Sequence, residues 1–440
     1  MSLVSLLLPL VVVLGAALLM GRLARRMGLP AVLGELCAGV VLGTSLLVYV
    51  APAWLDGLAR TATTPSPLVV AAGKIGVLLL VGITGMHVDL AFARRNGAAA
   101  ARVSLAGLAI PLTLGAGCGL LLPSSLIGSG TERGVFAVFV GVALCVSAIP
   151  VISKMLIDMR LLHRDFAQLT LSAAMIDDAA GWLMLSVVLG AATAGLTFLG
   201  VAGAVLKVAA IVVFAVVLGR PLVRAAVAPV ADGRPVALAV VLAGLVLAGA
   251  LATGAIGAEP VAGAFVCGVL IGSCTDVDAG RAVPLNVLVV AVLAPIFFVT
   301  AGLKVDLSAL GEPGVAVAGV VVVAIAIAGK FSGAFLGARM SNFGNWEAVA
   351  LGAGLNARGV IGIVIATTGL QTGVLNAASY TILLLVAILT SFMAAPVLRI
   401  AERRIPQTAA EREREAALGL YPATEPPPGL HAELRPRTAS

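Results

Sequence analysis

Residues 169–187 read LTLSAAMIDDAAGWLMLSV, an apolar run with two adjacent acids, Asp177 and Asp178, near its centre. A run of about 20 mostly apolar residues is long enough to cross a bilayer as a helix. Each ionised carboxylate at that depth costs about 2.5–3.5 kcal/mol on insertion scales, and intramembrane acids usually face an ion path or a partner. The run therefore predicts a membrane-spanning helix whose midpoint binds something positive.

The remainder of the chain has the same character. Of its 440 residues, 60% are hydrophobic and 11% are charged, whereas a soluble domain carries about 25% charged residues. Apolar stretches near spanning length recur to about residue 398, and they are too long and too continuous for barrel strands. We therefore expect an all-α membrane protein. Its net charge of +7 comes from basic residues in short loops, so we expect no nucleic-acid partner.

The apolar pattern predicts about thirteen membrane-spanning helices within a transmembrane domain of residues 1–399. Their expected ranges are 2–22, 30–50, 67–90, 98–122, 134–157, 165–191, 197–219, 235–254, 259–274, 284–306, 313–339, 345–369 and 376–398. The loops that this order places outside hold only three basic residues, Arg60, Arg133 and Lys304. The positive-inside rule therefore predicts a cell-membrane protein with its N-terminus outside and its C-terminus in the cytoplasm.

Residues 400–440 differ from the rest, because Arg, Glu, Pro and Ala replace the apolar residues. This composition predicts a largely disordered cytoplasmic tail with a short helix near residues 409–418. The tail contains no strand followed by G-x-G-x-x-G. We therefore expect no nucleotide-binding domain there, and we expect neither a cofactor nor an enzyme activity in the chain.

Glycine patterns indicate an internal repeat. The two copies carry the same spacing at Gly34, Gly39 and Gly43 and at Gly263, Gly268 and Gly272. The next predicted helix ends in TGMHVDL (84–90) in one copy and AGLKVDL (301–307) in the other. An odd number of helices separates the copies, so they cross the membrane in opposite directions. We predict inverted repeats of about 1–192 and 235–399 joined by a linker helix at about 197–219, an architecture common in secondary transporters.

Two predicted helices are interrupted at corresponding places in these repeats. The helix at 134–157 contains SAIP (147–150), whose proline removes a backbone donor, and the helix at 345–369 contains GAGLNARG (352–359). Matched interruptions are the best sequence pointer to a transporter site, although each one alone is equally well explained as a kink. We expect two crossed discontinuous helices whose free ends meet near the bilayer midplane.

Lys330 stands alone in the apolar run VVVAIAIAGKFSGAF (321–335). An ion pair with one aspartate would offset the burial of both charges, and whether such a pair is structural or functional stays open. Adjacent helix positions differ by about 100°, so we expect Asp177 and Asp178 to face different ways, one toward the crossing and one toward a neighbouring helix. Carboxylate oxygens bind either a proton or an alkali cation. Competition between the two at one site, combined with alternating access, is exchange.

Three further residues are accessory candidates: Asn356, Arg358 and Glu35. Asn356 and Arg358 belong to the second interruption, where the arginine is better explained as compensation for carbonyl ends than as a ligand. Glu35 lies near the inner end of the second predicted helix. A cytoplasmic funnel and a plain helix-end acid explain it equally well.

Several segments together resemble the monovalent cation:proton antiporter-2 family of sodium/proton exchangers. They are LGELCAGVVLGTSLL (33–47), the interruption at 144–156, MIDDAAGW (175–182), IFFVTAGLKVDL (296–307), the segment around Lys330, and NWEAVALGAGLNARGVIGIVIA (345–366). The resemblance implies a core domain, a dimerisation domain, elevator-like movement and a homodimer. The expected function is then exchange of protons for Na+ or K+.

The same resemblance implies roles for single residues. Asp178 is then the principal carrier of ion and proton, Asp177 pairs with Lys330, and Ser147 lies near the bound ion. An acid at position 177 is typical of the electrogenic members, which move two protons per cation. The SAIP segment departs from the Thr-rich stretch of the relatives, so ion selectivity stays open.

Two alternative functions also stay open. One is a ligand-gated potassium efflux protein that is close to a channel, although such relatives carry the nucleotide-binding domain that the tail lacks. The other is a proton-coupled exporter of an organic solute on the same scaffold. A larger site of that kind would need more aromatic lining than a chain with 4% aromatic residues offers.

Overall fold

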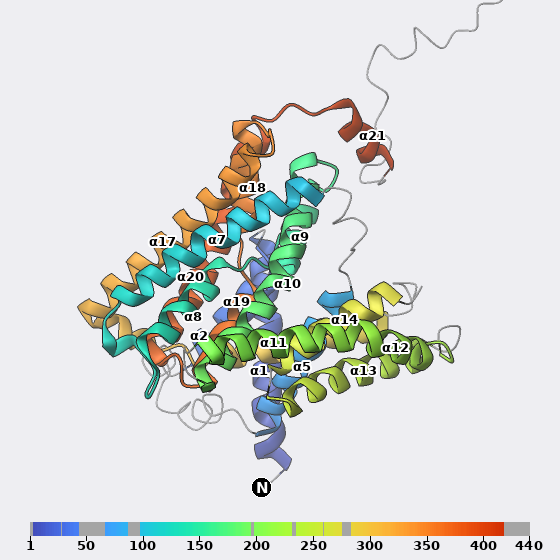
Figure 1. The fold of residues 1–440 in the computed structure, drawn as a ribbon, viewed down its shortest axis with the longest axis vertical. Helices are drawn as coiled ribbons and strands as arrows, with labels where there is room; N and C mark the ends of the chain where they lie inside the picture. The colour runs from blue at the N-terminus through green and yellow to red at the C-terminus, as the bar shows by residue number, and fades with distance from the viewer. Residues whose placement is uncertain are drawn as a thin grey trace, which may run out of the picture.

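The computed structural model describes residues 3–27, 29–43, 67–86, 97–194, 198–230, 235–257, 259–274 and 283–417. Apart from turns and one isolated bridge between Ile127 and Leu375, these residues are helical (Figure 1). The helices of the first half are α1 (Leu3–Arg26), α2 (Ala31–Leu42), α5 (Pro67–Met86), α7 (Gly97–Leu121), α8 (Arg133–Cys145), α9 (Ile149–Asp158), α10 (Asp165–Ala194), α11 (Phe198–Phe214) and α12 (Arg220–Val227).

The second half continues in the same way. Its helices are α13 (Pro235–Ala255), α14 (Pro260–Cys274), α15 (Val283–Leu288), α16 (Ala294–Gly302), α17 (Pro313–Arg339), α18 (Asn345–Asn356), α19 (Val360–Gln371), α20 (Ala377–Glu402) and α21 (Ala409–Ala417). Single π-helical turns, Ala215–Gly219 and Val289–Leu293, join α11 to α12 and α15 to α16. The tail helix expected near 409–418 is therefore present as α21.

Each of the thirteen predicted ranges contains at least one helix or part of one. Eight helical segments of the described chain are long and apolar enough to span a membrane, or nine if the bent pair α18–α19 forms one span. The number of spans therefore stays a prediction. The last predicted residues of the second and third helices, 44–50 and 87–90, lie outside the described residues, as does the tail beyond residue 417.

The two predicted repeats pack against each other through equivalent glycines. α2 lies against α16, where a Cβ added to Gly302 would fall 2.8 Å from the Cα of Gly39. α14 lies against α5, where a Cβ added to Gly85 would fall 3.2 Å from the Cα of Gly268. Gly39 and Gly268 hold the same place in the two glycine patterns, and each meets a helix of the other repeat. Such small residues let the helix backbones approach closely.

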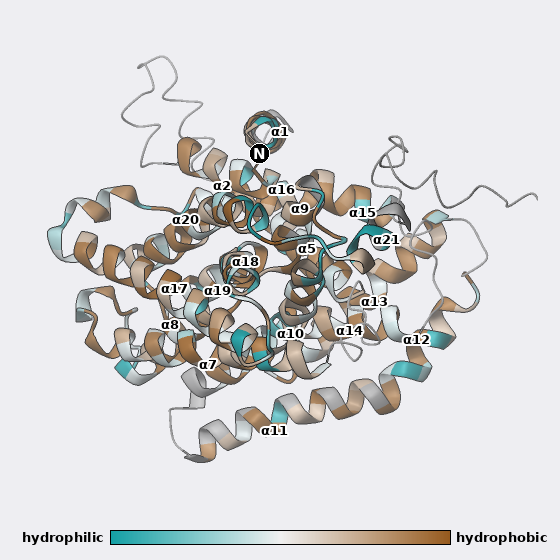
Figure 2. Cartoon of the chain, turned by 90° about the horizontal axis from the view of Figure 1, so that it is seen from above, coloured by the Kyte–Doolittle hydropathy of each residue, from teal (hydrophilic) through white to brown (hydrophobic). Residues whose placement is uncertain are grey.

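The site helix α10 lies inside the bundle. It contacts α7, α8 and α18, while α7 and α17 run side by side (Figure 1). α11 instead follows one edge of the molecule (Figure 2), and its large apolar side chains Leu199, Leu206 and Phe214 are exposed. Exposed apolar surface of this kind is suited to lipid.

Both expected interruptions are present, and both are shorter than the sequence indicated. α8 ends at Cys145 and α9 begins at Ile149. The break therefore precedes Pro150, which lies in the first turn of α9, where a missing N–H leaves no helical bond unmade. The expected interruption at this segment is therefore confirmed, with the helix broken directly before the proline.

The second interruption is confined to residues 357–359. α18 continues through the first two glycines of the GAGLNARG segment to Asn356, and α19 begins at Val360, with a bend of 41° between them. After α19 the chain turns at once into α20, because the side chain of Asn376 accepts the Ser379 N–H at 3.0 Å and caps the new helix.

Candidate functional site

The two interrupted helices meet at their breaks. Ser147 Oγ, in the first break, lies 2.9 Å from the Leu355 carbonyl oxygen near the end of α18. Gly359, in the second break, lies so close to α9 that an added Cβ would fall 2.2 Å from Cγ2 of Val151. Backbone groups that a continuous helix would pair are thereby gathered in one buried place.

Two buried cations cover the carboxyl end of α8. Arg358 donates from Nη2 to the Leu144 carbonyl at 2.5 Å and from Nη1 to the Ala143 carbonyl at 3.3 Å. Lys330 Nζ donates to the next carbonyl, that of Cys145, at 2.6 Å. The last carbonyls of a helix lack helical partners and form the negative end of its dipole. The two side chains donate to these carbonyls and place positive charge beside them, an arrangement consistent with charge compensation by Arg358.

Arg358 also joins two other parts of the bundle. Its Nη2 lies 3.1 Å from the Ala326 carbonyl of α17, and its own carbonyl accepts a hydrogen bond from Ser391 of α20. The residue is 2% exposed. Arg358 therefore fixes the second break against α8, α17 and α20.

Asp177 is fully paired. Its Oδ2 lies 2.5 Å from Lys330 Nζ, and both side chains are completely buried. The hydroxyl of Ser104 in α7 lies 2.6 Å from its Oδ1, and that of Ser147 lies 2.8 Å from its Oδ2. One ion pair and two hydroxyl donors therefore support its negative charge, and the ion pair implied by the resemblance is present.

Ser147 has two acceptors within reach but one hydrogen. A hydroxyl donates one hydrogen bond at a time, so it serves either Asp177 or the Leu355 carbonyl. When Ser147 donates to Asp177, the Leu355 carbonyl at the second break is left available for another partner.

Asp178 is buried but poorly satisfied. It is 0% exposed, its Oδ1 accepts the backbone N–H of Ile149 at a long 3.4 Å, and its Oδ2 has no hydrogen-bond partner among the described residues. Ile149 is the first residue of α9, so the carboxylate faces the positive end of that helix dipole. A buried carboxylate without partners is costly as a free anion. This environment therefore favours a bound proton or a bound cation.

Asn356 adds a second unsatisfied polar group. It is 0% exposed, and neither its amide oxygen nor its amide nitrogen has a hydrogen-bond partner within the described ranges. It is the last residue of α18, directly after Leu355. Its amide therefore lies at the second break, where an oxygen ligand would be useful.

Glu35 is placed elsewhere. It is 8% exposed, and its side chain lies against Gly21 of α1. None of the described contacts joins it to Asp177 or Asp178. The structure therefore brings together Asp177, Asp178, Ser147, Lys330, Asn356 and Arg358, and it adds Ser104, which the sequence analysis did not identify.

Comparison with known proteins agrees with this geometry. Residues 12–401 match the family described as sodium/hydrogen exchanger, transmembrane. The chain belongs to the sodium/hydrogen exchanger family. The family resemblance and the antiporter fold predicted from the sequence are thereby confirmed.

Several members of the exchanger family are similar along most of this chain. It is 29% identical over 399 residues to the Na+/H+ antiporter NhaS4 of Synechocystis sp., covering 90% of this chain and 97% of that protein. It is 27% identical over 389 residues to the Na+/H+-K+ antiporter GerN of Bacillus cereus, covering 87% and 92%. It also matches cation/H+ antiporter 17 of Arabidopsis thaliana at 29% identity, but spans only 48% of that longer protein.

Among solved structures, the sodium proton antiporter MjNhaP1 of Methanocaldococcus jannaschii has the same fold. The TM-score is 0.66 at 18% identity, covering 90% of this chain and 97% of that one.

Proposed function

We propose that this chain exchanges protons for a monovalent cation, Na+ or K+, across the cell membrane, with Asp178 as the carrying group. The observation that carries the proposal is the contrast between two neighbouring carboxylates. Asp177 is fully paired, whereas Asp178 Oδ2 is buried without a hydrogen-bond partner in the described part of the chain. The names of NhaS4, a Na+/H+ antiporter, and GerN, a Na+/H+-K+ antiporter, support the same assignment.

A proton and a cation are alternative ways to neutralise Asp178. Alkali cations are hard ions that prefer oxygen ligands. The carbonyl of Leu355 and the amide oxygen of Asn356 are candidate ligands beside the carboxylate. Because one carboxylate does not hold both charges, an arriving cation displaces the proton. Exchange follows when each loaded form opens to either side of the membrane in turn.

A second proton is proposed to come from the pair of Asp177 and Lys330. A cation bound at Asp178 adds a positive charge beside a buried ammonium, and the repulsion favours loss of the Lys330 proton. Exchange of two protons for one cation moves net charge, so the cycle is electrogenic. Release of the Lys330 proton is thereby coupled to binding of the cation at Asp178.

The orientation and assembly belong to the same proposal. The distribution of basic loop residues supports an external N-terminus and a cytoplasmic C-terminus. The family resemblance supports a homodimer, in which α7–α10 and α17–α20 move as a core domain against the other helices. The gathering of both broken helices and Asp178 within that set of helices is consistent with a moving core.

Transport by the purified protein in vesicles tests the assignment. A preset pH gradient should collapse when Na+ or K+ is added, and Asp178→Asn should abolish the effect. Asp306→Asn is the matched control, because Asp306 caps a short turn outside the site, where its Oδ1 accepts the Ser308 N–H at 3.0 Å. Retained exchange in the Asp178 variant would refute the assignment.

Coupling between cation flux and proton flux distinguishes the proposed exchanger from the channel-like alternative. A potassium efflux channel would pass K+ without moving protons, whereas the proposed exchanger moves cations only in exchange for them. Cation flux that persists when the proton gradient and the membrane potential are both clamped to zero, with no matching proton flux, would favour the channel.

A further inference from the structure

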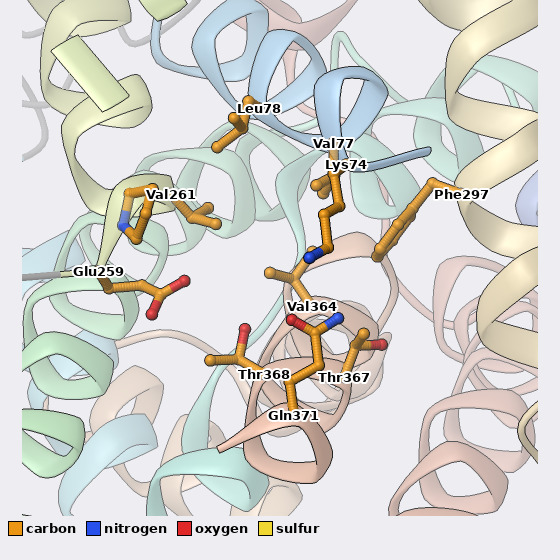
Figure 3. A pocket seen from close by; sticks show the side chains of 11 residues that line it. Lys74, Val77, Leu78, Glu259, Val261, Phe297, Val364, Thr367, Thr368 and Gln371 are labelled. Atoms are coloured by element: carbon orange, nitrogen blue, oxygen red, sulfur yellow. The ribbon is translucent and has the colours of Figure 1, made fainter. Parts of the chain in front are cut away.

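A cavity of about 190 Å³ lies between α19 and a wall formed by α5, α14 and α16 (Figure 3). The α19 side of the cavity consists of Val364, Thr367, Thr368 and Gln371. The opposite wall includes Lys74 of α5, Phe297 of α16 and Glu259, which directly precedes α14. The cavity therefore separates one half of a broken helix from helices outside the proposed core domain.

The cavity lies along α19, from Val364 to Gln371. Gln371 ends α19, and the chain then enters α20, which runs 26 residues, or about 39 Å, to Glu402 beside the tail. Gln371, and with it this end of the cavity, therefore lies toward the face opposite the tail. At its inner end, Val364 lies only four residues, about 6 Å along the axis, from the first residue of α19 at the second break.

Opposite charges face the same space. Figure 3 shows the Glu259 carboxylate and the Lys74 ammonium pointing into the cavity, with the Thr368 hydroxyl and the Gln371 amide on the other side. Neither Glu259 nor Lys74 has a hydrogen-bond or ion-pair partner among the described residues. Both charges are therefore available to act on an ion in the cavity.

We propose that the cavity is the outer access vestibule of the exchanger and that Glu259 and Lys74 set the local cation concentration in opposite directions. The proposal rests on the proposed exchange function and adds the residues that govern access from one face. Ionised Glu259 attracts cations and offsets the charge of Lys74. With Glu259 neutral, Lys74 is left to repel cations from the vestibule.

The ionisation of Glu259 makes this access dependent on pH. Burial raises the pKa of Glu259 from 4.5 to about 7, so the side chain loses its charge as the pH at this face falls through neutrality. Lys74 is the other charged group that lines the cavity. Lys304, which follows α16, lies close enough to Lys74 for the two positive charges to repel each other. The residues of α19 that face the cavity are uncharged.

The proposal can be tested in vesicles that hold the protein in a single orientation. One variant removes the negative charge of the cavity and the other removes the positive charge. Glu259→Gln should raise the KM for the cation at the outer face about threefold to tenfold at pH 8, and Lys74→Met should lower it by a similar factor. Both effects should shrink as an impermeant salt is added, because salt screens the charges. The KM at the inner face should stay as in wild type.

The control is Glu312→Gln. Glu312 is exposed and precedes α17, on the same face as Gln371, since the neighbouring loop residue Asp306 bonds to Thr381 at the start of α20. The Glu312→Gln variant should leave the KM for the cation unchanged at both the outer and the inner face. Equal effects at the two faces, effects of the same sign in the two variants, or no effect would overturn the vestibule. A different result would show that the proposed exchange function itself is wrong: wild type would then show no exchange from either face.

Discussion

Glu411, in α21, accepts the backbone N–H of Asp165 at 2.7 Å. Asp165 is the first residue of α10, the helix that carries Asp177 and Asp178. Glu411 is 2% exposed, and Arg164 Nε lies 3.4 Å from its Oε1. The start of the tail is thus fastened to the N-terminus of the site helix, where the unpaired N–H groups and the dipole favour a carboxylate.

Removal of this carboxylate should release the tail. Burial by itself raises the pKa of Glu411, but the N–H groups of Asp165 and Thr408 and the charge of Arg164 outweigh it and hold the pKa below 4.5. A carboxyl with a lowered pKa stabilises the folded contact above about pH 4.5, and that contribution is lost as the pH falls through the folded-state pKa. Hydrogen bonds to a charged group contribute about 1.5–3 kcal/mol.

We therefore predict that Glu411→Ala speeds amide hydrogen exchange in α21 and in the first turn of α10 by about tenfold or more at pH 7. The ratio of rates between variant and wild type should approach one in acid. Glu413→Ala, an exposed position on the same helix, is the control and should change little. An equal ratio at both pH values would show that the charge of Glu411 is not involved.

The buried pair of Lys330 and Asp177 gives a second prediction. Lys330→Ala leaves a buried carboxylate without its counter-charge, which typically destabilises a protein by about 3–5 kcal/mol. The double variant Lys330→Ala with Asp177→Asn removes both charges, so it should unfold at a higher temperature than Lys330→Ala alone. Thermal unfolding of the purified proteins measures this, and a double variant that is no more stable than the single one would argue against coupling.

The same variants should also change transport. Without Lys330 the proposed source of the second proton is lost, so exchange should continue without net charge movement. Current recorded from variant vesicles during exchange should fall to background while the pH change persists. A full current in Lys330→Ala vesicles would contradict the proposed electrogenic cycle.

The two serines that contact Asp177 should differ in effect. Among the described residues the Ser104 hydroxyl hydrogen-bonds only to Asp177, so Ser104→Ala should lower stability by about 1.5–3 kcal/mol with little change in KM. Ser147 also reaches the Leu355 carbonyl, so Ser147→Ala should raise the cation KM as well. Ser186, whose hydroxyl donates to the Trp182 carbonyl in its own helix, is the matched control. Identical KM values in all three variants would remove Ser147 from the ion site.

Part of this site is predictable from sequence because isolated charges in apolar helices have few explanations. Asp177, Asp178 and Lys330 stand out for that reason, and the ion pair of Asp177 with Lys330 follows from the need to bury both charges together. The fold is also predictable, since long apolar runs and repeated glycine spacings determine helix length and close contacts.

Other features depend on contacts that sequence spacing does not reveal. Ser104 is one serine in an apolar helix, a residue that usually bonds within its own turn. Pro150 marks the start of α9 rather than the break, because proline is equally suited to a first turn and to a kink. Glu411 lies in a polar segment whose composition indicates disorder, and only the fold places it beside Asp165.

Proton release on cation binding tests the role of Asp178 most directly. Purified protein in weakly buffered solution should release protons when Na+ or K+ is added, because the cation displaces the proton that neutralises Asp178. Asp178→Asn should release none and Asp306→Asn should release as much as wild type. Undiminished proton release from the Asp178 variant, at the same cation affinity, would contradict the account.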